Sequence, residues 1–79
     1  MTLKKSKREV AIELVRAECI NHQQNPDDLD SSAAVGLLDD MCHTHPDSPA
    51  VKWYLKASDH QIDLFESDWD LYATEVKVA

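Results

Sequence analysis

Glycine is nearly absent from this sequence, which has one glycine and three prolines among its 79 residues. Small β-barrels and sandwiches need many tight turns and runs of β-branched residues, and this chain has neither. No apolar run approaches the length of about 20 residues that a membrane-spanning helix requires. These absences favour an all-α fold, and we expect residues 1–79 to form one small bundle of about four helices.

Basic residues are scarce beyond the start of the chain. Residues 17–79 hold three lysines against thirteen acids, a net charge of −10, whereas residues 1–16 carry a net charge of +3. An acidic body repels phosphate, so we expect no direct nucleic-acid partner. The polar, basic start lacks the apolar stretch of a secretory leader, which favours a cytoplasmic protein with reduced cysteines, and we expect residues 1–5 to be disordered.

Helix-start signals divide the chain into four helical segments. Ser6 is the expected N-cap of a helix over residues 6–22, and Asp30 or Ser31 caps a second over 31–43. Pro46 ends the second segment, and Asp47-Ser48-Pro49 restarts the chain as a helix over 49–57. Ser58-Asp59 then begins the last helix, whose end, residues 75–79, could instead fray or pair as a short strand.

Apolar spacing predicts which faces of these helices are buried. In the last helix the seam is spaced 3-4-3-4, although it is too short to indicate a coiled coil; it consists of Ile62, Phe65, Trp69, Tyr72 and Val76. The third helix is expected to bury Val51, Tyr54 and Leu55, with Trp53 on a flank. In the first helix the wide apolar face includes Ala17, and Arg16 lies on the opposite stripe. Gly36 costs about 1 kcal/mol within the second helix, which predicts close packing there.

Two Cys-x-x-His pairs form the one ligand-like constellation of the sequence: Cys19 with His22, and Cys42 with His45. Two thiols and two imidazoles are the ligand types of a tetrahedral zinc site, so a zinc-stabilised module is one hypothesis. Both pairs fall at helix C-terminal ends, which an antiparallel hairpin would separate by about 20 Å. The alternative is that the cysteines pack as small apolar groups and the histidines interact with the helix dipoles.

The nine residues Asp30 to Leu38 begin with Asp-Ser at a helix start, and this stretch resembles the second helix of acyl carrier proteins. That resemblance implies a phosphopantetheine group on Ser31, although the next residue is Ser32 where the family has leucine. Asp-Ser is also an ordinary N-cap signal.

For catalysis the sequence offers histidines beside acids, such as His60 next to Asp59. A bundle this small has little concave space for a substrate, and we expect no enzymatic activity.

Acidic residues form a stripe along the last helix, at Asp59, Asp63, Glu66 and Asp70, with no lysine or arginine between residues 57 and 76. We therefore expect a non-enzymatic protein-binding module, a regulator or inhibitor that occupies a basic or grooved surface of its partner. Its contacts would be Asp63, Glu66 and Asp70, aided by the aromatic residues Trp53 and Trp69. The alternative is an acidic DNA mimic that blocks a nucleic-acid-binding protein, and a homodimer is also compatible with the sequence.

Overall fold

Four α-helices make up the fold in the computed structural model, which describes the backbone of residues 6–78 and the side chains of residues 6–72. The helices are α1 (Lys7–Asn21), α2 (Ser31–Thr44), α3 (Pro49–Lys56) and α4 (Asp59–Val78), and a 3-10 turn, η1 (Pro26–Asp28), lies between the first two. No strand occurs in this part of the chain, which confirms the all-α prediction. The prediction for residues 1–5 lies outside the described residues.

Each helix begins at a side chain that caps its first turn. Ser6 Oγ accepts the Glu9 N–H at 3.1 Å, and Asp30 Oδ1 accepts the Ala33 N–H at 2.8 Å. Ser48 Oγ and Ser58 Oγ do the same for α3 and α4, each at 3.3 Å. These oxygens satisfy N–H groups that have no partner within the helix, which is why the sequence signals placed the helix starts correctly.

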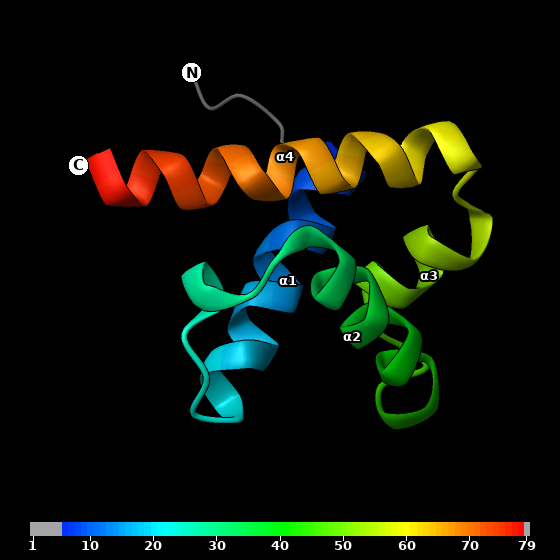
Figure 1. The fold of residues 1–79 in the computed structure, drawn as a ribbon. Coiled ribbons are helices and arrows are strands. Elements are labelled where there is room, and N and C mark those ends of the chain that lie inside the picture. The colour runs from blue at the N-terminus through cyan, green and yellow to red at the C-terminus, as the bar shows by residue number, and fades with distance from the viewer. Residues whose placement is uncertain (1–5, 79) are drawn as a thin grey trace, which may run out of the picture.

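The long helix α4 runs across the upper part of the view in Figure 1, and α2, α3 and most of α1 lie below it. Helix α1 packs mainly against α3, and α4 packs mainly against α2 and then α1. The buried core draws on all four helices; it consists of Ala11, Ile12, Val15, Cys19, Ala34, Leu38, Met41, Ala50, Val51, Phe65 and Trp69. None of the helices described is long and apolar enough to cross a bilayer.

Trp69 is the largest side chain in this core and is fully buried. Its indole N–H donates to the Leu29 carbonyl at 2.8 Å, which ties α4 to the segment after η1. Phe65 stacks on Trp69 with 6.1 Å between ring centroids, and Arg16 lies over the indole with its guanidinium carbon 5.8 Å from the centroid. Phe65 and Trp69 of the predicted seam are therefore core residues, whereas Ile62 and Tyr72 are half-buried.

Several faces differ from the sequence-based expectation. Ala17 is exposed and Arg16 is largely buried, because α1 turns the Arg16 side toward α4 and η1, where Arg16 pairs with Asp27 at 2.9 Å. Leu55 is 69% exposed, since the short helix α3 buries only the side carrying Ala50 and Val51. Gly36 is also exposed, and a Cβ atom there would meet nothing within 4 Å, so the predicted close packing is wrong.

The C-terminal ends of α4 and α1 differ in how they finish. Helix α4 continues to Val78, so residues 75–78 are helical and do not form the alternative strand. Helix α1 ends in a Schellman motif, in which the Gln24 N–H donates to the Cys19 carbonyl at 2.8 Å and the Gln23 N–H to the Ile20 carbonyl at 2.9 Å. Gln23 occupies the left-handed position of that motif with φ 61°. Glycine is the usual residue at this position.

Candidate functional site

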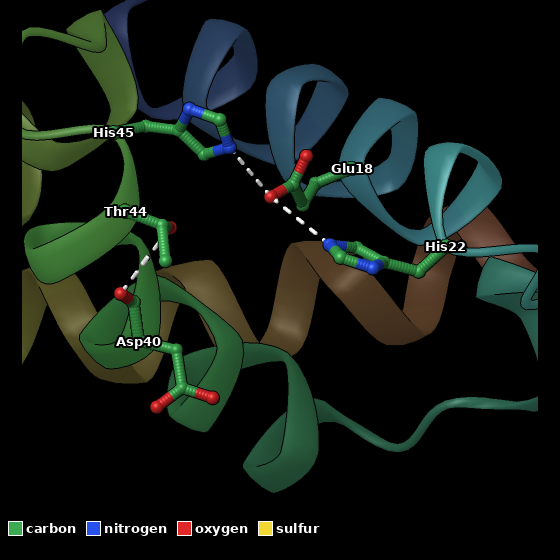
Figure 2. Close-up of polar contacts among 5 residues, drawn as sticks. All are labelled: Glu18, His22, Asp40, Thr44 and His45. Carbon is green, nitrogen blue, oxygen red and sulfur yellow. Dashed lines mark hydrogen bonds and ion pairs between the residues drawn. The ribbon is translucent and has the colours of Figure 1, made fainter.

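A buried carboxylate between two imidazoles joins the C-terminal ends of α1 and α2 (Figure 2). Glu18, only 8% exposed, accepts the Nε2–H of His45 at 2.8 Å and that of His22 at 3.4 Å, both on Oε2. His22 is the C-cap of α1, one turn beyond Glu18, and His45 is the C-cap of α2. The two helix ends therefore meet here, in contrast to the separation of about 20 Å expected for an antiparallel hairpin.

The electrostatics of this cluster favour the ionised carboxylate. Burial alone would raise the pKa of Glu18, but the hydrogen bonds from His45 and His22 and the attraction of their positive charge outweigh it, so this pKa lies below its ordinary value. The contact with His45 spans 27 residues of sequence and links two helices. This hydrogen bond joins α1 to α2, and its strength depends on the charge of the Glu18 carboxylate.

The four predicted zinc ligands do not converge. His22 and His45 both contact Glu18, whereas Cys19 is fully buried in the core and the Cys42 thiol donates to the Leu38 carbonyl at 3.5 Å. Burial raises the pKa of the Cys19 thiol, which disfavours the thiolate that zinc binds. Among the described side chains, no three from His, Cys, Asp and Glu are placed to hold a metal ion. This arrangement does not support the four-ligand zinc hypothesis, and both cysteines have packing roles instead.

The predicted partner-binding acids lie on one side of α4 away from the core. Asp59, Asp63 and Asp70 are exposed and Glu66 is half-buried, at the 4-3-4 spacing that keeps them on one stripe. Asp68 lies outside this stripe and pairs with Arg8 of α1 at 2.7 Å. We call Asp59, Asp63, Glu66 and Asp70 the acidic stripe.

The two predicted aromatic contacts differ in their exposure. Trp69 has no exposed surface, so it is a core residue and cannot be the partner contact that the sequence suggested. Trp53 is half-buried on α3 and stacks on Phe65 with 5.6 Å between ring centroids. One edge of the aromatic stack therefore reaches the surface, and it does so at Trp53.

Trp53 lines a groove that the sequence analysis missed. The groove has a volume of about 560 Å³ and runs between the start of α1, the length of α3 and the start of α4; its walls are Lys7, Val10, Pro49, Lys52, Trp53, Lys56, Ala57 and Gln61. We call it the lysine–tryptophan groove. Its one local signal in the sequence is the pair of lysines that flank Trp53 on α3, because Lys7 and Gln61 come from distant segments.

No protein-family model, curated protein or solved structure matches this chain. In particular, no carrier-protein family matches the stretch around Ser31. In the structure Asp30 is the N-cap of α2 and Ser31 is its first residue, half-buried. The Asp-Ser pair thus has a structural role as a helix start.

Proposed function

We propose that this chain is a protein-binding module, a regulator or inhibitor whose acidic stripe on α4 occupies a basic surface of a partner protein. The observation that carries this proposal is the placement of the stripe. Its carboxylates project from one flank of a long helix that Phe65 and Trp69 anchor in the core. Charges held on a rigid helix lose little conformational entropy on binding, which favours specific contact with a basic surface.

The sequence of α4 also places no basic residue among these acids. No lysine or arginine occurs between residues 57 and 76, and the nearby cation Arg8 is engaged by Asp68 on another side of the helix. Long-range attraction of a basic partner would speed association, and it would weaken as salt screens the charges.

The test is capture of a partner on the immobilised chain, with mass spectrometry to identify it, followed by affinity measurements on three versions of the chain. The stripe variant, Asp63→Asn, Glu66→Gln, Asp70→Asn, neutralises three of the four acids of the stripe. The control variant Asp28→Asn, Asp40→Asn, Asp47→Asn removes the same charge from exposed positions elsewhere. We expect the stripe variant to bind at least about tenfold more weakly and the control within about twofold of the parent.

The outcomes separate the stripe from other mechanisms. Undiminished binding by the stripe variant would exclude the acidic stripe as the contact, and equal losses in both variants would show a dependence on net charge alone. The partner is also tested with duplex DNA as competitor. Displacement of the chain by DNA would make the partner a nucleic-acid-binding protein and this chain an acidic DNA mimic.

A further inference from the structure

The lysine–tryptophan groove concentrates positive charge on an otherwise acidic protein. Lys52 and Lys56 stand one helical turn apart on α3, and Lys7 faces them from the start of α1. Among the side chains that the structure describes, no carboxylate lines the groove. The chain has a formal net charge of −7, yet two of the three lysines beyond residue 16 belong to this one feature.

These three cations are not neutralised within the described residues. With the side chains of residues 6–72 none of them forms an ion pair, whereas Arg8 and Arg16 each pair with an aspartate. Like charges one turn apart on a helix repel each other. A set of unpaired, mutually repelling ammonium groups gains stability when carboxylates of a ligand come between them, so the groove is complementary to an anionic occupant.

The apolar part of the groove is held in place by the core. Trp53 stacks on Phe65, and Phe65 in turn stacks on the buried Trp69, so the exposed edge of the indole is fixed before any ligand arrives. Val10 and Ala57 are half-buried beside it. A rigid aromatic residue at the centre of a concave surface is the usual anchor for a large apolar side chain of a protein ligand.

We propose that the lysine–tryptophan groove binds an acidic segment of another protein, one in which a large apolar side chain packs on Trp53 between carboxylates that pair with Lys7, Lys52 and Lys56. Three ammonium groups contributed by two helices require several carboxylates on one chain, which a short acidic peptide supplies. This surface has the opposite charge to the acidic stripe and is independent of it, so either proposal can fail while the other stands.

The probe is a labelled peptide of sequence Asp-Glu-Phe-Leu-Glu-Asp, compared with its uncharged counterpart Asn-Gln-Phe-Leu-Gln-Asn by fluorescence anisotropy. The Lys52→Gln, Lys56→Gln variant removes two charges from the groove. The matched control Gln24→Glu, Ser67→Glu reaches the same net charge through exposed positions outside the groove. Thermal melts of both variants check that the fold is kept, and indole N–H signals in NMR spectra report on each tryptophan separately.

We expect the acidic peptide to bind, the uncharged peptide to bind at least about tenfold more weakly, and the groove variant to lose about tenfold in affinity. The control variant should stay within about twofold of the parent. On binding, the indole signal of Trp53 should shift, while that of the buried Trp69 moves much less.

Four results would overturn the proposal. One is equal weakening in the groove variant and the control, which would assign binding to the overall field. Another is the absence of a shift at Trp53. A third is tighter binding of a small aromatic anion, phenyl phosphate, than of the peptide. The last is a dimer in sedimentation of the free chain that the groove variant abolishes, since the occupant would then be a second copy.

Discussion

At the scale of single residues, Glu18 illustrates what sequence spacing can and cannot reveal. The Cys-x-x-His pairs drew attention to His22 and His45, and the structure does bring these two histidines to one place. They meet at a carboxylate that no motif singles out, because Glu18 lies among apolar residues of α1 and its contact with His45 depends on how α1 and α2 cross. Residue spacing within one helix does not reveal that crossing, because the crossing results from packing between distant segments.

Glu18→Gln tests the electrostatic role of this carboxylate. Because the pKa of Glu18 is lowered in the folded state, ionisation stabilises the fold fully above its ordinary pKa of about 4.5, and this contribution is lost as pH falls through the folded-state value. The variant should therefore be less stable than the parent by about 1–2 kcal/mol near pH 6. The difference should shrink between about pH 5 and about pH 3.

Urea unfolding at a series of pH values measures this difference directly. Asp63→Asn is the control, because Asp63 is an exposed acid on the solvent side of α4. A Glu18→Gln deficit that stays constant down to pH 3 would mean that shape, and not charge, determines the role of Glu18.

At the scale of helices, the predicted boundaries agree with the structure because helix starts are local. Ser6, Asp30, Ser48 and Ser58 each bind an N–H two or three residues ahead, which requires no information from elsewhere in the chain. Exposure is a different matter. Leu55 and Ala17 looked internal by spacing alone, yet whether an apolar side chain is covered depends on which neighbouring helix reaches it.

The use of glycine gives a prediction at this scale. The one glycine of the chain, Gly36, lies within α2 with open space around its Cα, while Gln23 holds the left-handed position that ends α1. Gly36→Ala should raise the free energy of unfolding by about 1 kcal/mol, because alanine costs less backbone entropy in a helix. Gln23→Gly should also stabilise, by about 1 kcal/mol, because it relieves the left-handed strain.

Denaturant unfolding of the two single variants and of the double variant measures these gains. The sites lie on different elements and share no hydrogen bond, so the gains should add. A loss of stability in Gly36→Ala would contradict the open environment found around Gly36 and would restore the close packing that the sequence suggested.

At the scale of the whole molecule, the fold separates positive and negative charge into two surfaces that the order of residues along the chain does not show. By sequence, the basic residues are concentrated at the start of the chain and the rest is acidic. In three dimensions Lys7 meets Lys52 and Lys56 at the lysine–tryptophan groove, and the acidic stripe belongs to α4. The stripe could be predicted because one helix carries it, whereas the groove could not, because three segments build it.

The stack of Trp53, Phe65 and Trp69 connects several helices of this small domain. Trp69 contacts Phe65 of its own helix, donates to Leu29 beyond η1 and lies beneath Arg16 of α1, so its side chain joins three segments at the centre of the core. The spacing of α4 indicated an apolar seam, but the bond to Leu29 and the position of Arg16 depend on the tertiary fold. Stability in a domain of 79 residues should thus depend strongly on this one residue.

Trp69→Ala should lower the free energy of unfolding by about 3–5 kcal/mol, because it opens a large cavity and leaves the Leu29 carbonyl without its donor. Total stability for a domain of this size is only about 4–12 kcal/mol, so the variant can unfold at ambient temperature. Trp69→Phe retains an aromatic ring and removes the N–H donor, and it should cost less, about 1–3 kcal/mol. Leu71→Ala, at a leucine of α4 that is 57% exposed, should change stability by no more than about 0.5 kcal/mol. Circular dichroism melts rank the three variants, and a Leu71→Ala loss as large as that of Trp69→Ala would place the buried side of α4 at Leu71 instead.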